Sequence, residues 1–261
     1  MTQIDRANLF ASLHVKGDPL ILFNIWDPGS ARAVAEAGAK AIATGSWSVA
    51  AALGCDDGED VPLDLSLANA KRVVIAVDLP VTIDFEGGYG KTPEAVAENV
   101  KQLIETGAVG CNFEDQIVGG DGLYSVDEQS ARIEAICRAA EQAAVPFFIN
   151  ARTDIFLQAE PADHHVHLEE AERRAQVCAR AGASGFFAPG LSQPEQIRRL
   201  CDRSPLPVNI MVVSDMPSNQ ELAALGVARI SYGPGPYREM IAFLTRAAQQ
   251  TFAASKKTPN N

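Results

Sequence analysis

Two carboxylates that follow one short apolar run are the residues of this chain best suited to chemistry. Asp84 and Glu86 come two positions apart at the end of a β-rich segment, and a glycine-rich turn follows them. On an extended chain, residues two positions apart point to the same side, so both carboxylates can converge on one point. A second β-rich run also ends in acid, at Glu114 and Asp115. The plainer alternative is that these are solvated acids before a turn. Carboxylates without a nearby thiolate or imidazole suit Mg²⁺, however. We therefore predict a metal site of Asp84, Glu86 and Glu114.

Two other predicted strand ends carry groups that bind anions. Gly45 and Ser46 follow a short β-rich run, and backbone N–H groups in such a turn can meet a carboxylate or phosphate oxygen. An ordinary turn is the plainer interpretation of that pair. Arg152 lies at the end of another run, within the sequence Asn-Ala-Arg-Thr-Asp. A guanidinium among acids is either a structural ion pair or a clamp for a substrate carboxylate, and the spacing leaves both open.

A strand followed by a helix recurs along the chain and would bring these residues together. The β-rich runs span residues 20–25, 41–44, 81–85, 109–113, 146–150, 185–188, 208–212 and 227–231. Segments with helical apolar spacing follow them at 30–37, 65–76, 93–106, 126–143, 168–181, 194–201, 219–225 and 236–253. Such units without long spacers favour an α/β fold of the (β/α)8 TIM barrel type over an open doubly wound sheet. In these barrels the active site lies at the carboxyl ends of the strands.

Composition narrows the class of protein and of partner. The chain has 261 residues, 47% of them hydrophobic, so we expect a single barrel domain over residues 1–254 and a disordered tail over 255–261. A net charge of −11 argues against nucleic acid and anionic membranes as partners, because both require a basic face. The five cysteines are scattered and form no C-x-x-C pair, which indicates reduced thiols in a cytoplasmic protein. No secretory signal and no membrane-spanning apolar run is found.

Six motifs, in order along nearly the whole chain, resemble the isocitrate lyase/phosphoenolpyruvate mutase superfamily. They are Asn24-Ile25-Trp26-Asp27, Gly45-Ser46-Trp47-Ser48, Leu53-Gly54 with Asp56-Asp57-Gly58, Asp84-Phe85-Glu86-Gly87-Gly88-Tyr89-Gly90, Asn112-Phe113-Glu114-Asp115 and Asn150-Ala151-Arg152-Thr153-Asp154. The resemblance implies a (β/α)8 barrel whose last helix packs on a neighbouring subunit, in a homodimer or homotetramer. It also implies Mg²⁺, for which Mn²⁺ can substitute, and a small α-keto or α-hydroxy acid substrate. Similar enzymes break or make a C–C or P–C bond beside a pyruvate unit through an enolate.

The resemblance further implies roles for individual residues. Asp84 would hold the metal, with Glu86 and Glu114 acting largely through its waters. Asp57 matches an acid on the gating loop of phosphonate-handling members, and residues 55–62 are expected to close over the substrate. The implied catalytic residues are Asp57, Glu114 and Arg152. The implied substrate-binding residues are Trp26, Gly45, Ser46, Trp47, Arg152 and Asn209.

Two departures from the family pattern bear on the reaction. Isocitrate and methylisocitrate lyases carry a Lys-Lys-Cys-Gly-His loop after the fourth strand, whereas residues 116–124 here contain no cysteine, lysine or histidine. Those lyases also place a glutamate after the sixth strand, where this chain has Pro189-Gly190. Phosphoenolpyruvate mutases have a longer polar loop after the fourth strand. We therefore expect a member outside both the isocitrate/methylisocitrate lyase and the phosphonate mutase subgroups.

The expected activity is the cleavage of a small acid. We predict a Mg²⁺-dependent lyase that cleaves a C–C bond beside a pyruvate-like unit, similar to an oxaloacetate decarboxylase or hydrolase. A fixed cation and N–H donors would stabilise the developing enolate. One alternative is a P–C bond enzyme, similar to phosphonopyruvate hydrolase or mutase. Another is a non-catalytic α-keto acid binding protein, and a Schiff-base aldolase is disfavoured because no lysine lies at a predicted strand end.

Overall fold

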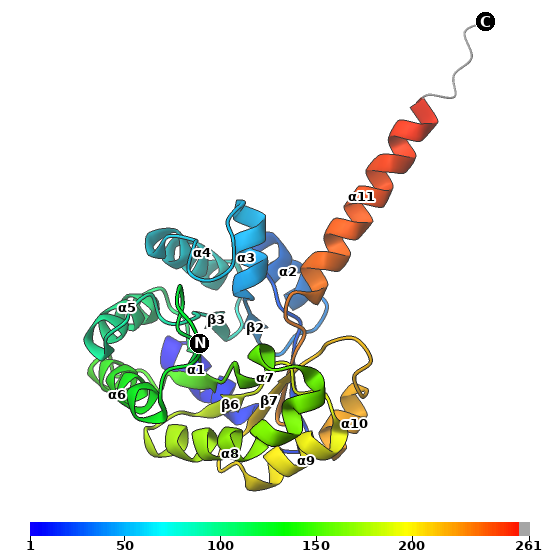
Figure 1. Ribbon diagram of the computed structural model, residues 1–261. Helices are drawn as coiled ribbons and strands as arrows, with labels where there is room; N and C mark the ends of the chain where they lie inside the picture. The colour runs from blue at the N-terminus through cyan, green and yellow to red at the C-terminus, as the bar shows by residue number, and fades with distance from the viewer. Residues whose placement is uncertain (256–261) are drawn as a thin grey trace, which may run out of the picture.

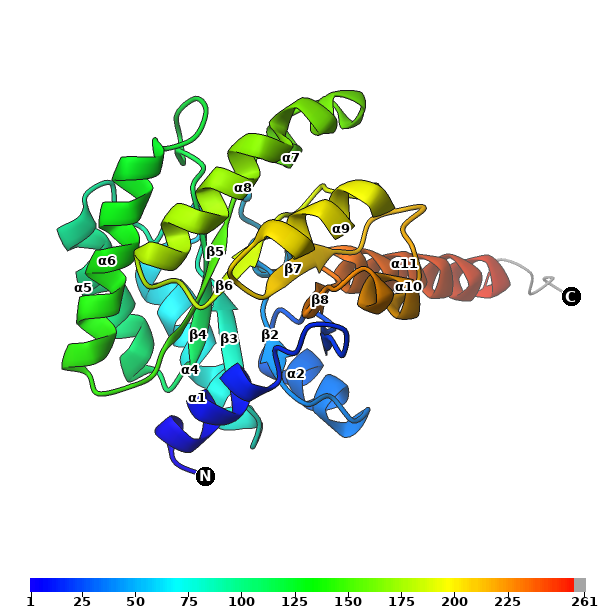
Figure 2. The same ribbon diagram turned by 90° about the horizontal axis from the view of Figure 1, so that it is seen from below.

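Eight parallel strands form a nearly closed barrel in the computed structural model, which describes residues 1–255 (Figures 1 and 2). The strands pair in the order β1-β8-β7-β6-β5-β4-β3-β2, and a parallel bridge between Ile25 and Thr44 joins the ends of β1 and β2. This arrangement confirms the predicted (β/α)8 barrel. The strands are β1 Leu20–Leu22, β2 Ile42–Ala43, β3 Val81–Asp84, β4 Gly110–Glu114, β5 Phe148–Arg152, β6 Gly185–Phe187, β7 Val208–Met211 and β8 Arg229–Ser231.

Helices alternate with the strands and surround the barrel (Figure 2). Every helix expected from the sequence is present, and α1, α3 and α7 come in addition to them. Helix starts follow local chemistry: the Thr92 side chain accepts from the Ala95 N–H at the start of α5, with proline at its first position. The helices are α1 Gln3–Ser12, α2 Pro28–Glu36, α3 Ser46–Leu53, α4 Leu63–Ala76, α5 Pro93–Glu105, α6 Val126–Gln142, α7 Ile155–Gln158, the 3-10 turn η1 Pro161–Asp163, α8 His164–Arg180, α9 Pro194–Arg203, α10 Asn219–Ala224 and α11 Gly235–Ser255.

Helix α1 packs against the end of the barrel where the strands begin. A capping box between Thr2 and Asp5 starts the helix. Its Phe10 is fully buried and meets the ring of Phe148 edge-on, with ring centroids 5.3 Å apart. The Gln3 side chain donates to the carbonyl of Ile104 at 2.8 Å, which fixes the helix to the barrel. The carboxyl ends of the strands lie at the opposite end.

A polar layer fills the middle of the barrel. Asp84, Asn112 and Asn150 are register neighbours on β3, β4 and β5, and Asn209 and Arg229 are neighbours on β7 and β8. The three asparagines and the arginine are buried. Buried polar groups require hydrogen-bond partners, so this layer is a network that constrains the side chains above it.

Helix α11 extends away from the barrel (Figure 1), and its Phe243, Leu244 and Phe252 side chains are exposed. On the barrel, the outward side chains of Ile21 and Phe23 are also exposed, and they line an apolar groove beside α2. Exchange of α11 between subunits is not shown in this single chain. The tail expected over 255–261 begins at the last residue of α11, and residues 256–261 lie outside the described part of the chain.

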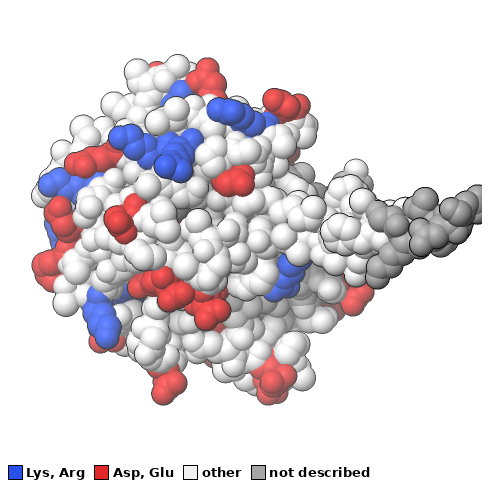
Figure 3. Space-filling model, turned by 90° about the horizontal axis from the view of Figure 1, so that it is seen from above, with Lys and Arg blue, Asp and Glu red and all other residues white. Residues whose placement is uncertain are grey.

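The surface carries no broad separation of charge on the face shown in Figure 3, where acidic and basic side chains are interspersed. Within residues 1–255, no helix has the length and apolar content needed to cross a membrane. The five cysteines are all free thiols.

Candidate active site

A cavity of about 140 Å³ lies at the carboxyl ends of the strands. Strands from opposite sides of the barrel contribute to its wall, with Asp84 from β3, Arg152 from β5 and Phe187 from β6. Six of the residues predicted from the sequence line it, namely Gly45, Ser46, Trp47, Asp57, Asp84 and Arg152. The fold therefore brings together groups that are more than 100 positions apart in the sequence.

The Asp84 carboxylate is fixed by donors on two sides. Ser46 donates to Asp84 Oδ2 from its backbone N–H at 3.0 Å and from its hydroxyl at 2.9 Å, and Asn112 Nδ2 donates to Oδ1 at 3.1 Å. Ser46 begins α3, so Asp84 lies at the positive end of that helix. The Gly45 N–H donates to the carbonyl of Ile25 at 3.1 Å. Two of the N–H groups expected to hold a substrate thus have partners within the protein.

The turn after β3 holds Glu86 beside Asp84. Glu86 and Gly88 have positive φ angles of 50° and 80°, and a Cβ on Gly88 would lie 3.0 Å from the ring of Phe113. The buried guanidinium of Arg132 donates to the carbonyl of Gly87 at 2.6 Å and braces the turn from α6. Glu86 is therefore held in place with only 6% of its surface exposed. Burial, followed by the negative charges of Asp57 and Asp84, raises the pKa of Glu86 to about 8.

Arg152 lies among three carboxylates. Its Nε is 2.7 Å from Asp154 Oδ1, and its Nη1 is 3.0 Å from Glu114 Oε2 and 3.9 Å from Asp84 Oδ1. Burial raises the pKa of Glu114 well above its usual value, although the charge of Arg152 opposes the shift. Within residues 1–255, no hydrogen bond from Arg152 Nη2 is found, and the side chain lines the cavity. The arginine is thus an ion-pair member and still presents a donor to a ligand.

Residues 55–62, here called the lid, cover the end of β3. The backbone N–H of Glu59 donates to the Glu86 carboxylate, and Glu59 Oε1 accepts from the Tyr89 N–H at 2.7 Å. These contacts hold the lid over the strand end and place Asp57 in the cavity wall. Burial, followed by the charge of Asp84, raises the pKa of Asp57.

Two residues expected to bind substrate lie outside the cavity wall. Trp26 meets Tyr237 of α11 edge-on, with ring centroids 5.0 Å apart. Asn209 lies in the polar layer and accepts from the Ser231 hydroxyl at 3.2 Å. Conversely, Asn112 lines the cavity and contacts Asp84, although it was not among the site residues predicted from the sequence. Its position two residues before Glu114 on the same strand was the available signal, because both side chains then share a face.

The oxygen donors fit a hard divalent cation held largely through water. Within residues 1–255, no three His, Cys, Asp or Glu side chains are arranged to hold a metal ion directly. Mg²⁺ keeps several waters and is commonly bound by one or two carboxylates, so Asp84 with water-mediated contacts to Glu86 and Glu114 suits it. Burial is the first cause of the raised pKa of Glu86 and of Glu114, and neighbouring carboxylates add to it, so the ionised groups would gain from further positive charge as compensation. A bound cation would supply that compensation.

Known proteins match the chain along most of its length. The phosphoenolpyruvate phosphomutase family matches residues 10–252. The crystal structure of a "putative phosphonomutase" from Burkholderia cenocepacia J2315 has a TM-score of 0.93 and 50% identity, over 95% of this chain and 99% of that chain. The 2-methylisocitrate lyase of Escherichia coli is 29% identical over 255 residues, which are 93% of this chain and 82% of that protein. The oxaloacetate decarboxylase of Pseudomonas entomophila is 26% identical over 237 residues, or 87% and 78% of the two chains.

The fold is also shared with phosphonopyruvate hydrolase, whose crystal structure contains oxalate and Mg²⁺. That structure has a TM-score of 0.84 over 98% of this chain and 88% of the other, at 21% identity, which establishes the common fold alone.

The subgroup expected from the sequence is wrong. A position outside both the methylisocitrate lyase and the phosphonate mutase subgroups was inferred from loop 116–124 and from the end of β6. Relatives named for both subgroups nevertheless match nearly the whole chain. Loops vary in length and sequence while the scaffold persists, so a missing loop motif was weak evidence against membership. In the structure, that loop is a short excursion closed by a bridge between Gln116 and Leu123. The chain is an enzyme of the phosphoenolpyruvate phosphomutase family, within the isocitrate lyase/phosphoenolpyruvate mutase superfamily.

Proposed function

We propose that this protein is a Mg²⁺-dependent lyase that cleaves a C–C bond beside the pyruvate-like unit of a small α-keto or α-hydroxy acid. Oxaloacetate is the first candidate substrate. The observation that carries the proposal is the excess of carboxylates, Asp57, Asp84, Glu86 and Glu114, around one arginine at the mouth of the barrel. These four residues are here called the acidic cluster. A site of this charge attracts a cation first, and a cation with Arg152 can then hold an acid.

The cavity is suited to a small acid. A volume of about 140 Å³ admits only a compact ligand. Arg152 Nη2 is the donor for the substrate carboxylate, and a guanidinium fixes the orientation of a carboxylate better than an ammonium does. Phe187 and Pro189 form an apolar part of the wall that limits the size of the group opposite the carboxylate.

The chemistry is divided between the cation and the protein. Mg²⁺ or Mn²⁺, held by Asp84 and through water by Glu86 and Glu114, would supply Lewis-acid stabilisation of the enolate oxygen. Ser46 and Asn112 keep the Asp84 carboxylate in one orientation. Burial and the charge of Asp84 raise the pKa of Asp57, which favours a proton on this carboxyl beside the cavity, and Asp57 is our choice of donor to the enolate carbon. The lid excludes water, which strengthens these electrostatic interactions.

A substrate screen tests the proposal. Small α-keto and α-hydroxy diacids are incubated with the protein and Mg²⁺, and release of pyruvate or glyoxylate is measured. We expect turnover of at least one diacid, its loss on addition of a chelator and its recovery with Mg²⁺ or Mn²⁺. Turnover that survives chelation contradicts the enolate mechanism. Saturable Mg²⁺-dependent binding without turnover would indicate a non-catalytic α-keto acid binding protein.

A P–C bond enzyme is the second candidate. The observation that favours it is the 50% identity with the Burkholderia cenocepacia protein described as a "putative phosphonomutase". The same acidic cluster and Arg152 would serve phosphonopyruvate, because P–C cleavage also produces a pyruvate enolate. Phosphonopyruvate therefore belongs in the screen, with release of inorganic phosphate or formation of phosphoenolpyruvate as the readout. Preference for this substrate over every diacid would replace the first candidate.

We also propose that this protein is cytoplasmic and that it forms a homodimer or homotetramer through α11. The support is the exposed apolar face of α11 together with the apolar groove between β1 and α2. Two apolar surfaces on one chain that do not meet can be buried by a second copy. Light scattering should give two or four subunits, and deletion of residues 236–261 should give an aggregating or unstable protein. A stable, active monomer at micromolar concentration would exclude this assembly.

A further inference from the structure

Arg229 is a buried cation inside the barrel with no role in the chemistry described above. It lies on β8, beneath the mouth of the barrel, and none of its surface is exposed. Within residues 1–255, no carboxylate lies within 4.0 Å of its guanidinium. Its Nε and Nη1 groups have no hydrogen-bond partner in the structure. The charge of Arg229 also acts on His14. Burial is the first cause and the charge of Arg229 the second cause that lower the pKa of His14 to about 3.

A structural role in stability does not account for this residue. A buried charge without a carboxylate partner loses its hydration and gains little in return, and an apolar side chain of similar length would be more stable there. The other fully buried large arginine, Arg132, differs in this respect, since it donates to three protein oxygens and stacks on Phe113 and Tyr124. Arg229 has one hydrogen bond to the described protein and a more distant ring contact, with Cζ 6.0 Å from the centroid of Phe10, so its contacts return less stability than those of Arg132.

The one hydrogen bond that Arg229 makes leads to the site. Its Nη2 donates to Asn112 Oδ1 at 3.0 Å, and Asn150 Nδ2 donates to the same oxygen at 2.9 Å. Two donors on Oδ1 fix the orientation of the Asn112 amide. Asn112 Nδ2 is then directed at Asp84 Oδ1, 3.1 Å away. A rotated amide would instead place its oxygen against the carboxylate and turn an attraction into a repulsion.

We propose that Arg229 is a positioning residue of the active site, which sets the Asn112 amide and, through it, the orientation of the Asp84 carboxylate. Ser46 holds Asp84 Oδ2 from one side, and the chain from Arg229 through Asn112 holds Oδ1 from below. Asp84 is the carboxylate assigned to the cation, so the proposal rests on the proposed function. Partners that orient a metal-binding carboxylate typically change metal affinity 10–100-fold when they are removed.

Binding of Mn²⁺, followed by electron paramagnetic resonance, tests the proposal without relying on turnover. Arg229→Met removes the charge and the donor while keeping the length of the side chain. We expect its Mn²⁺ affinity to fall about 10-fold, while its melting temperature without metal is unchanged or higher. Arg229→Lys keeps the charge and one donor for Asn112, so it should recover part of the lost affinity.

A double substitution tests whether Arg229 acts through Asn112. Asn112→Leu should weaken Mn²⁺ binding, and adding Arg229→Met to it should cause no further loss. Thr82→Val is the matched control, because Thr82 is buried on β3 and its hydroxyl has no hydrogen-bond partner among the described residues, so it is not a member of this chain of hydrogen bonds. It should leave the affinity unchanged.

The outcomes separate this inference from the proposed function. If the unsubstituted protein binds Mn²⁺ and Arg229→Met binds it equally well, the inference is wrong and the proposed function stands. A further loss in the double variant, or an equal loss in Thr82→Val, also overturns the inference. If the unsubstituted protein binds no Mn²⁺, the proposed metal site itself fails. Should Arg229→Met not fold, Asn112→Leu still decides, because an affinity equal to that of the unsubstituted protein contradicts the role of this chain of hydrogen bonds.

Discussion

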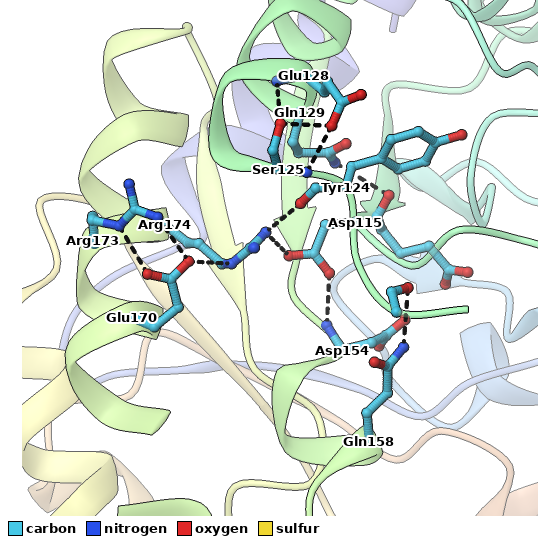
Figure 4. A network of polar contacts seen from close by, with 12 residues as sticks. Asp115, Tyr124, Ser125, Glu128, Gln129, Asp154, Gln158, Glu170, Arg173 and Arg174 are labelled. Carbon is cyan, nitrogen blue, oxygen red and sulfur yellow. Dashed lines mark hydrogen bonds and ion pairs between the residues drawn. The ribbon is translucent and has the colours of Figure 1, made fainter. Parts of the chain in front are cut away.

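Two consecutive carboxylates at the end of one strand show how differently the same chemical group is used. Glu114 ends β4 and joins the acidic cluster, where its ion pair with Arg152 is shared with Asp154 and Asp84. Asp115 is the next residue. It accepts from the backbone N–H of Asp154 at 2.9 Å and from Arg174 Nη1 at 2.8 Å (Figure 4).

The contacts of Arg174 complete this second group. Arg174 also donates to the carbonyl of Tyr124 and pairs with Glu170 at 3.0 Å. Each oxygen of Asp115 thus has a donor from the protein, and its charge is matched by one arginine. Asp115, Arg174 and Glu170 are here called the Asp115 network. It ties β4 to α8 and needs no ligand.

The difference between the two groups lies in their charge balance. The acidic cluster has four carboxylates around one arginine, and Asp57, Asp84 and that arginine line the cavity. The Asp115 network has a partner for every charge and lies outside the cavity wall. Removing a partner from the second arrangement costs stability, whereas the crowded charge of the first would be compensated by a bound cation. Substitutions in the two groups should therefore have opposite effects on activity and on stability.

The largest effect is expected at Asp84. Asp84→Asn keeps the shape of the side chain but removes the charge that holds the cation. Activity should fall about 10³-fold or more, since both the cation and the orientation of the enolate are lost. The melting temperature without metal should not fall, because one of several crowded negative charges is removed. Steady-state kinetics measures the activity, and calorimetry measures the melting temperature. Near-normal turnover would show that Asp84 is not the metal-binding residue.

The reverse result is expected at Asp115. Asp115→Asn breaks the buried ion pair with Arg174 and leaves Glu170 as the carboxylate partner of that arginine, which should lower the free energy of unfolding by about 3 kcal/mol. Activity per folded molecule should remain close to normal. Denaturant unfolding and assays below the melting temperature measure these quantities. A large loss of turnover with unchanged stability would erase the distinction between the two groups.

A smaller effect is expected at Arg152, which pairs with protein carboxylates and would also hold the substrate carboxylate. Arg152→Lys keeps the positive charge for Asp154 and Glu114 but removes the fork that would hold a carboxylate. We expect kcat/KM to fall roughly 30-fold, which is a loss of about 2 kcal/mol in transition-state stabilisation. The free energy of unfolding should change little. A large loss of stability with unchanged affinity for the substrate would show that the arginine is only a structural ion-pair member.

The smallest effect is the pH dependence of stability due to Glu86. Its pKa is about 8 in the folded protein against an ordinary value of 4.5, so the folded state binds this proton more tightly than the unfolded chain. The free energy of unfolding without metal should therefore fall as the pH rises from about 4.5 toward 8. Glu86→Gln should flatten this dependence, which melting temperatures measured across this pH range will show. Identical pH profiles for both proteins would contradict the assigned environment of Glu86.

Much of the fold could be predicted from the sequence because the strands and helices carry strong periodic signals. The eight strands and the helices between them were expected from apolar runs and from caps such as Thr92-Pro93. Helix α3 was missed because Gly45-Ser46 resembles a turn and the sequence Ser-Trp-Ser-Val-Ala-Ala-Ala-Leu has no polar face. Helix α1 was missed although Thr2 and Asp5 form the spacing of a capping box.

The candidate-site residues at the mouth of the barrel could be named from the sequence. The residues beneath them, within the strands, could not. Carboxylates at strand ends, such as Asp84 and Glu114, are visible because the barrel fold assigns function to those positions. Asn112 and Arg229 lie within strands, where a polar residue has no meaning until the register shows its neighbours. Which carboxylate is matched by an arginine also depends on contacts between distant segments, as between Asp115 and Arg174. No spacing along the chain encodes that pairing.

The most direct test of the central claim is the binding of Mn²⁺ to three proteins near neutral pH. The claim is that the acidic cluster is a cation site and the Asp115 network is structural. The account predicts one Mn²⁺ site in the unsubstituted protein and in Asp115→Asn, measured below its melting temperature, and no such site in Asp84→Asn. Undiminished binding by Asp84→Asn, or no binding by the unsubstituted protein, would contradict it.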